Sequence, residues 1–460
     1  MSSEPRPRSL KLLALFFAIG LIAFGYAWMT VHRRSMATLS STDAPIRAHA
    51  IITHWINHGF FASYGMLWPT PDGKFIYRSG TGAFMVSGFL VEKVWMAMTG
   101  RYGWRLLALH NEMVLLLISS LLALLAFRIA RRLGAGPVHS FVLAVAAQMV
   151  WFTFPENLAS YWFLSEQTWC LLPALVFLLL EERALDRGRT RLLTALQALA
   201  VFALTYIEYV VGTMFIVSYV ATIFLLRGDR PSFKRLGAIL LLPWICAFAI
   251  YGIELLGVRQ VSRQTGAKLT GSDFLYRSGL DGDAMFYGDH LDIAFGRDVV
   301  RGGRSPHLFR WEWLFLCGLA AVLATLAAYI RGLVPRIAVE TLIVLIGSWF
   351  LYAAVFSQAV ALHPYLFDVM LATPLIVALF VFVPALAESR TNQSGMIVLL
   401  AIFAATWFSM FQLRVYAMLY PAPQPAAGAP GNARALIVSR SLVAPAHDGD
   451  VSAMGDDAAS

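Results

Sequence analysis

The sequence alternates long apolar runs with short polar connections along nearly its whole length. Runs of about 18 or more apolar residues, enough to cross a bilayer as a helix, recur from the N-terminal SLKLLALFFAIGLIAFGYAW onward. These runs are too long and too continuously apolar to be strands of a membrane barrel, and inside lipid the remaining solution for the backbone is a helix. The pattern therefore predicts an all-α polytopic membrane protein.

About eleven membrane helices fit the pattern. The predicted ranges are 10–31, 105–127, 138–155, 162–180, 192–207, 209–226, 236–256, 311–330, 337–356, 367–386 and 395–413. The first resembles a signal peptide, but it is long and lacks a small-x-small cleavage site before Arg33, so we expect it to be retained. A further apolar stretch, 81–98, carries Glu92 and Lys93, and we expect it to lie re-entrant or flat at the interface rather than to cross.

Arginine and lysine are distributed unequally between alternate connections, which predicts the orientation. They cluster at 128–132, 183–191, 227–235, 331–336 and 390, whereas 156–161, the turn around 208 and 357–366 contain none. Because basic residues favour the cytoplasmic side in short loops, the N-terminus is predicted inside and the long loops 32–104 and 257–310 outside, in the inner (plasma) membrane of a bacterium. We expect one transmembrane domain, 1–413, and a disordered external, periplasmic tail, 414–460.

The composition agrees with this assignment and excludes other classes of protein. Of the 460 residues, 58% are hydrophobic and only 14% are charged, against roughly 25% charged in a soluble chain. The net charge of +9 comes from the topology clusters, so we expect no nucleic-acid partner. Cys170, Cys246 and Cys317 lie in separate predicted helices, which argues against a disulfide or metal framework.

Ionisable residues near the predicted helices gather on the outer side, and such residues mark function in membrane proteins. Those in the outer half or at the outer edge are Glu112, Glu156, Glu166, Glu208, His363 and Asp368, with Asp43 in the first loop, while the inner half carries little beyond Glu340. This predicts a polar cavity open to the outside and favours binding or chemistry there. A transporter or flippase of lipid-linked sugars or other envelope precursors is the alternative. Glu112 also has a simpler interpretation as the partner of His110 or Arg105.

The segment TLSSTDAPIRAHAIITHW in the first loop carries the main candidate, Asp43. Its neighbour Arg47 falls one helical turn later if 44–57 is helical. The sequence STDAP is also typical of a helix start, so Asp43 alternatively serves only as an N-cap, with Pro45 in the first turn. We expect His54 to be an ordinary packing residue.

A divalent metal has only a weak candidate site, and we assign no cofactor. Asp281 and Asp283 in the second loop supply carboxylate oxygens of the kind that Ca²⁺ and Mg²⁺ bind. A short acidic loop exposed to solvent accounts for the same residues, and we prefer that interpretation.

The order of features in the first loop resembles that of GT-C integral-membrane glycosyltransferases. Within that superfamily it is similar in layout to the lipid A aminoarabinose transferases and protein O-mannosyltransferase-like enzymes. The features that match, in order, are Asp43, Arg47, Gly59, Gly65, Tyr77 with Arg78, the apolar stretch 81–98, and Gly100 with Arg105; HPYLF, with His363 and Tyr365, resembles a later element. The family pattern has a second acid and Lys-Pro-Pro, where this chain has one acid and Arg-Ser-Gly-Thr.

The resemblance implies an enzyme that moves a sugar from a polyprenyl-phosphate donor to an envelope glycan, lipid or protein acceptor. Asp43 would be the catalytic base, and Arg47, Arg78 and Tyr77 would bind the donor phosphate. The residues expected to line the substrate cavity are Glu112, Glu166, Glu208, His363, Tyr365 and Asp368. The 81–98 helix would hold the prenyl chain, and a single displacement implies inversion at the sugar carbon.

Overall fold

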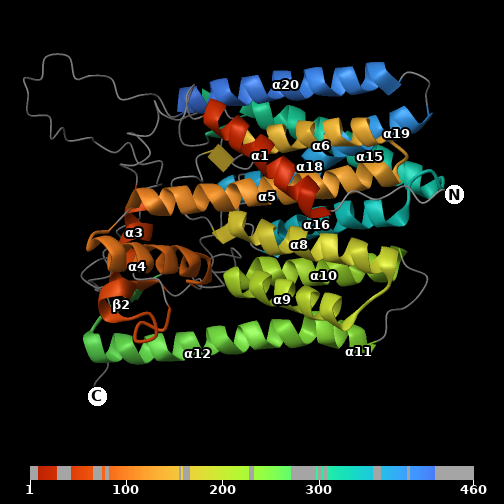
Figure 1. Ribbon diagram of the computed structural model, residues 1–460. Helices are drawn as coiled ribbons and strands as arrows, with labels where there is room; N and C mark the ends of the chain where they lie inside the picture. The colour runs from red at the N-terminus through yellow and green to blue at the C-terminus, as the bar shows by residue number, and fades with distance from the viewer. Residues whose placement is uncertain are drawn as a thin grey trace, which may run out of the picture. The chain divides into compact units, whose positions relative to one another are not determined.

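Long helices run side by side in the computed structural model (Figure 1). The structure describes residues 9–27, 43–65, 75–77, 82–102, 104–154, 157–158, 166–226, 233–270, 297–298, 303–304, 308–355, 364–390 and 394–419. All of them belong to one unit, Met1–Ala422. The boundary between the transmembrane domain, 1–413, and the tail, 414–460, stays a prediction.

Within the described residues, each predicted membrane range overlaps a helix or a continuous helical run. The long helices are α1 (Ser9–Ala27), α5 (Trp104–Arg132), α6 (Pro137–Phe152), α8 (Glu166–Arg187), α9 (Arg191–Ile207), α10 (Tyr209–Leu226), α12 (Leu242–Thr265), α15 (Leu308–Ile330), α16 (Arg336–Val355), α18 (Pro364–Val377), α19 (Val383–Arg390) and α20 (Ser394–Leu419). The short elements are α3 (Asp43–His58), η2 (Ala83–Met85), α4 (Val86–Thr99), α11 (Phe233–Leu236), the π-helical η3 (Gly237–Leu241) and η4 (Ala378–Phe382), and strands β1 (Phe75–Tyr77), β2 (Lys268–Thr270), β3 (Arg297–Asp298) and β4 (Gly303–Arg304).

Six helical runs in the described part of the chain are long and apolar enough to cross a membrane. They are Leu10–Ala27, Leu106–Arg132, Tyr209–Leu226, Phe233–Thr265, Leu371–Glu388 and Gly395–Arg414. Three further apolar helices, Pro137–Phe152, Arg191–Ile207 and Cys317–Ile330, are shorter. The fold is thus that of a helical protein with several membrane-spanning helices, and the number of eleven crossings stays a prediction.

Local sequence explains where several helices begin and bend. Thr190 caps α9, because its side chain accepts a hydrogen bond from the Leu193 backbone N–H at 3.2 Å. Near the start of α12, Pro243 has no N–H to donate, and the helix widens just before it. There the Leu242 N–H donates to the carbonyl of Gly237, five residues earlier, which is the π-helical pattern.

Buried polar side chains join the helices inside the bundle. The Gln148 side chain on α6 donates to the backbone carbonyl of Phe16 on α1 at 2.9 Å, and the Trp151 indole donates to Thr373 on α18 at 2.9 Å. Thr153 and Gln412 make a similar contact between α6 and α20. Because lipid offers no competing donors or acceptors, such bonds fix which helices are neighbours.

The bundle has two ends with different contents. At one, which we call the α4 end, lie α3, α4, β1, β2 and the start of α5 (Figure 1). There β1 pairs with β2 in parallel, with Ile76 opposite Leu269, so the first predicted loop is joined to the residues that follow α12. The opposite end holds the end of α5, where the Arg132 guanidinium lies 2.5 Å from Asp186 at the end of α8.

Candidate functional site

Helix α3 places Asp43 and Arg47 at the α4 end. The helix begins at Asp43 and ends at His58, which confirms the predicted helix 44–57 and puts Pro45 in its first turn. Arg47 comes one turn after Asp43, and His54 and His58 continue the same face at helical spacing. The structure describes the side chains of this helix from Ala50 onward.

The two histidines at the end of α3 form a stacked pair. Their ring centroids are 4.4 Å apart; His54 is buried, whereas His58 is exposed. Burial, with the neighbouring His58 imidazole as the smaller cause, lowers the pKa of His54 to about 4. His54 is therefore neutral at physiological pH.

An apolar cluster holds α3 against the bundle. Its centre is Trp55, whose fully buried ring meets Phe60 and Phe89 edge-on at centroid distances of 5.0 and 5.9 Å. The cluster consists of Ile51, Ile52, Trp55, Phe84, Met85, Phe89, Leu107 and Trp169, which come from α3, η2, α4, α5 and α8. Gly82 permits this packing, because a β-carbon there would lie 2.1 Å from the Gly65 carbonyl oxygen and 2.5 Å from the Trp55 ring. This packing thus fixes the position of α3, the helix that begins at Asp43.

Helix α4 is the apolar stretch that was expected not to cross the membrane. Its 14 residues span about 21 Å, too short for a bilayer core of about 30 Å. Glu92 is fully buried on one side, while Lys93 is exposed with its Nζ 5.5 Å from the centre of the Phe89 ring. The sequence pattern indicates only that Glu92 keeps the segment at the interface, whereas the structure buries its side chain in the protein.

Helices α5 and α8 bring a second polar group to this end. The Trp169 indole donates to the Asn111 side-chain oxygen at 3.1 Å, and the His110 ring stacks on Trp169 at 5.6 Å. Sequence reasoning missed Asn111 and Trp169, although Asn111 lies between His110 and Glu112 and Trp169 directly follows Thr168. Only the pairing of α5 with α8 reveals them.

Glu112 lies on a different side of α5. It is buried, and Leu116, one turn further on, lies beside Gly20 of α1. No hydrogen bond or ion pair joins Glu112 to another side chain within the described part of the chain, and His110 stacks on Trp169 instead. Glu112 and the group around Trp169 therefore face different neighbours.

Glu208 lies in the tight turn between α9 and α10 and is buried. Its carboxylate accepts a hydrogen bond from the Val210 N–H at 3.3 Å, at the positive end of α10. The turn is close because a β-carbon at Gly212 would lie 2.5 Å from the Cα of Thr205. Ile207, next to Glu208, packs on the Trp55 cluster, so Glu208 lies near the residues that hold α3 against the bundle.

Several predicted site residues have no described side chain. Asp43, Arg47, Tyr77, Glu166, Tyr365 and Asp368 belong to α3, β1, α8 and α18, which fixes their place along the backbone. Arg78, His363, Asp281 and Asp283 lie outside the described residues. Within those residues, no group of three or more His, Cys, Asp or Glu side chains is placed to hold a metal ion.

Acids are also buried at the opposite end, contrary to the expectation that this half carries little beyond Glu340. Glu181 and Glu182 are buried there and Glu388 is half-buried, and each has a basic partner. Glu182 contacts both Arg128 and Arg132, and Glu388 lies 2.6 Å from His139. The expectation was wrong because Glu181 and Glu182 follow the predicted end of their helix, whereas α8 continues for nearly two more turns with them inside.

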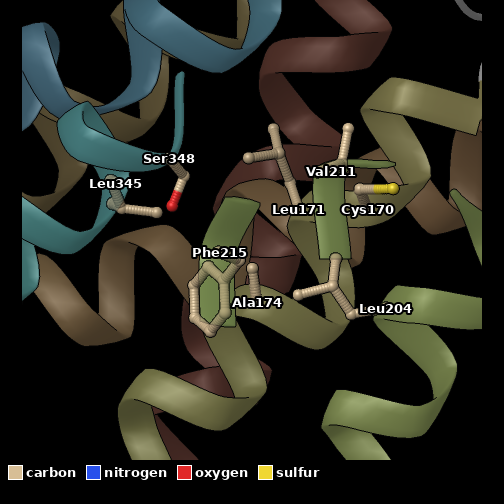
Figure 2. A pocket seen from close by; sticks show the side chains of 8 residues that line it. All are labelled: Cys170, Leu171, Ala174, Leu204, Val211, Phe215, Leu345 and Ser348. Atoms are coloured by element: carbon tan, nitrogen blue, oxygen red, sulfur yellow. The ribbon is translucent and has the colours of Figure 1, made fainter. Parts of the chain in front are cut away.

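A small cavity lies inside the bundle, one helical turn from Glu208. Figure 2 shows its lining, and its free volume is about 20 Å³. The residues that line it are Cys170, Leu171, Ala174, Leu204, Val211, Phe215, Leu345 and Ser348. Its one hydroxyl, on Ser348, already donates to the Val344 carbonyl at 2.5 Å, so the cavity offers little to a polar ligand.

Fold and composition together define a helical, multi-pass membrane protein. No protein-family model matches the sequence, and no curated protein matches it either. The function must therefore be inferred from the residues at the α4 end.

Proposed function

We propose that the protein is a membrane glycosyltransferase that moves a sugar from a polyprenyl-phosphate donor to an envelope glycan, lipid or protein. The observation that carries the proposal is the packing of α3 at the α4 end. This helix begins at the candidate base Asp43, has Arg47 one turn later, and packs through Trp55 on the apolar helix α4. An acid, a cation and an apolar support are what transfer from a lipid-phosphate donor requires.

Each part has a defined role in the proposed reaction. Asp43 accepts the proton of the acceptor hydroxyl as its oxygen attacks the anomeric carbon, and the bond from that carbon to the phosphate breaks. Arg47 and Arg78, with Tyr77, stabilise the charge that develops on the departing phosphate. A single displacement of this kind inverts the configuration at the sugar carbon.

Transport of lipid-linked sugars remains the second candidate. A transporter would need ionisable groups that change partners along a path between the two ends. The acids at the opposite end, Glu181 and Glu182, are held in place by arginines from three different segments. Ion pairs of this kind hold helices together and do not exchange partners. They therefore support the enzyme over the transporter.

The test separates the two interpretations of Asp43, base and helix cap. Asn is as good an N-cap as Asp but cannot accept a proton, so Asp43→Asn keeps the start of α3 and removes the base. We expect Asp43→Asn and Asp43→Ala to lower incorporation of radiolabelled sugar into envelope polymers by about 100-fold or more. His58→Gln, an exposed change on the same helix, is the matched control.

Membrane insertion of every variant is measured in parallel. Full transfer by Asp43→Asn together with loss in Asp43→Ala would assign Asp43 to capping alone and reject the base. Lipid-linked sugar that accumulates on the inner leaflet of cells lacking the protein would favour the transporter. Loss of activity in a chelator would bring Asp281 and Asp283 into the site.

A further inference from the structure

Helix α4 exposes an apolar stripe. Leu90, Val94 and Met98 are 54%, 60% and 76% exposed, and their spacing of four residues puts them on one face of the helix. Trp95 adds to the edge of this face. We call Leu90, Val94 and Met98 the α4 stripe.

The other face of α4 fastens the helix to the protein. Gly88, Phe89 and Glu92 are buried there, and Phe89 belongs to the Trp55 cluster. Because this face is fixed, the α4 stripe is turned away from the bundle. The helix cannot roll to bury it without drawing Glu92 out of its site.

The ends of α4 are also fixed. Gly100 adopts a left-handed conformation with φ 68°, and its N–H donates to the Met96 carbonyl at 2.8 Å, which stops the helix. The helix is therefore short and has a defined end. It cannot be part of a longer membrane-spanning segment.

Basic residues border the stripe. Lys93 is exposed beside it, with its Nζ 5.5 Å from the centre of the Phe89 ring, and Arg101 is exposed just beyond the helix. Because the Lys93 side chain is exposed and long, its charge can also reach toward water and lipid phosphate. The arrangement of stripe and charges matches the boundary between acyl chains and head groups.

A second exposed apolar surface belongs to α12, whose C-terminal end lies at the α4 end (Figure 1). Helix α12 belongs to a candidate membrane span, and its Ile253 and Leu256 are 63% and 66% exposed. Parallel pairing of β1 with β2 joins the first loop to the end of α12 (Figure 1). The α4 stripe thus lies at the same end of the bundle as the C-terminal end of an apolar helix that belongs to a candidate membrane span (Figure 1).

We propose that the α4 stripe is inserted into the lipid bilayer at the level where acyl chains meet head groups, with Lys93 at the lipid phosphates. The occupant of this surface is phospholipid, neither another protein nor a second copy of the chain. The proposal stands independently of the glycosyltransferase assignment.

Spin labels on the full chain in nanodiscs of phosphatidylcholine and phosphatidylglycerol test it. The exposed Cys246 and Cys317 are replaced by alanine, while buried Cys170 stays. Single labels at Val94→Cys and Met98→Cys are compared with Leu256→Cys as the lipid reference and Arg187→Cys as the water reference. Collision with oxygen reports lipid exposure, and collision with a soluble nickel chelate reports water exposure.

We expect the Val94 and Met98 labels to show oxygen access close to that of Leu256 and nickel access severalfold below that of Arg187. Nickel access equal to that of Arg187 would place the stripe in water and overturn the proposal. Low access to both reagents would show that protein covers the stripe, which overturns it equally. Lys93→Glu should make the Val94 label shallower; an unchanged depth would refute the role of Lys93.

Discussion

The aromatic ring of Tyr64 lies directly on Gly257 of α12. A β-carbon at Gly257 would be 2.3 Å from two ring carbons of Tyr64, closer than any real contact. Tyr64 itself has a left-handed backbone, with φ 52°, and Gly65 follows with φ 62°. This contact fastens the segment after α3 to α12, beside the paired strands β1 and β2.

Gly257→Ala should loosen that attachment. The new methyl group has to displace the Tyr64 ring or part α12 from the first loop, and overpacking of this kind costs about 1–3 kcal/mol. We expect a lower melting temperature and faster hydrogen exchange in residues 50–65 than in the rest of the chain. The measurement is hydrogen exchange with mass spectrometry on the purified protein.

Gly252→Ala is the matched control, because nothing lies within 4 Å of a β-carbon at that position on the same helix. Alanine is the better helix former by up to about 1 kcal/mol, so this variant should be at least as stable as the parent. Equal destabilisation by both substitutions would contradict the close contact between Tyr64 and Gly257.

The stacked pair at the end of α3 should make this region sensitive to acid. The pKa of His54 is about 4 in the folded protein and near 6.5 when unfolded, so the unfolded state binds more protons between these values. Stability from this source is complete above pH 6.5 and declines as the pH falls to 4. Exposed His58 keeps water near the pair, so we expect a loss of about 1–2 kcal/mol.

His54→Phe removes the titrating group and keeps a flat ring in the same place. Its melting temperature should fall less between pH 6.5 and pH 4 than that of the parent, while His58→Gln should retain most of the acid sensitivity. An identical pH profile for His54→Phe and the parent would show that the acid response arises elsewhere.

The helices could be predicted from the sequence because their signal is local. Runs of apolar residues and the breaks at Gly, Pro and charged connections mark each helix, and α3 was recognisable from STDAP ahead of its periodic pattern. Length decides whether a helix can cross a bilayer, and α6 and α9 are apolar but short. The local signal therefore predicts where helices lie better than it predicts which of them cross the membrane.

The polar groups around the site depend on which helices are neighbours, and that information is not local. Asn111 meets Trp169 only because α5 packs on α8, and they are 58 positions apart. Burial of Glu92 likewise follows from the packing of α4, while Lys93 next to it is exposed. A sequence pattern shows only the type and spacing of such residues. His49 and His54 of the same segment therefore look alike in the sequence, although the structure buries His54.

Filling the cavity shown in Figure 2 should stabilise the bundle. Val211 lines it, and Val211→Ile adds one methylene to a space of about 20 Å³, worth about 0.8 kcal/mol if the side chain fits. Val210, its buried neighbour, does not line the cavity, so Val210→Ile should destabilise by overpacking. Equal effects of the two changes on the melting temperature would show that the space is already filled.

At the opposite end, Glu181 accepts two hydrogen bonds from the Arg189 guanidinium, at 2.6 and 2.7 Å. Gln197 closes the ring, since it donates to Glu181 at 2.7 Å and accepts from Arg189 at 3.0 Å. Because Glu181 is buried, loss of Arg189 removes two of its hydrogen bonds and leaves the Arg235 guanidinium, 3.3 Å away, to compensate its charge. The connection between α8 and α9 thus depends on this pair.

Arg189→Gln should therefore lower the free energy of unfolding by about 2 kcal/mol, measured by denaturant titration in detergent. Adding Glu181→Gln removes the buried charge that has lost one of its two arginines and keeps hydrogen-bonding atoms, so the double variant should recover at least half of the loss. Arg187→Gln, an exposed change two residues earlier, should shift stability by no more than about 0.5 kcal/mol. If Arg189→Gln is as mild as Arg187→Gln, the ring around Glu181 does not stabilise the fold. If the double variant is as unstable as Arg189→Gln alone, the cost comes from lost hydrogen bonds and not from the buried charge.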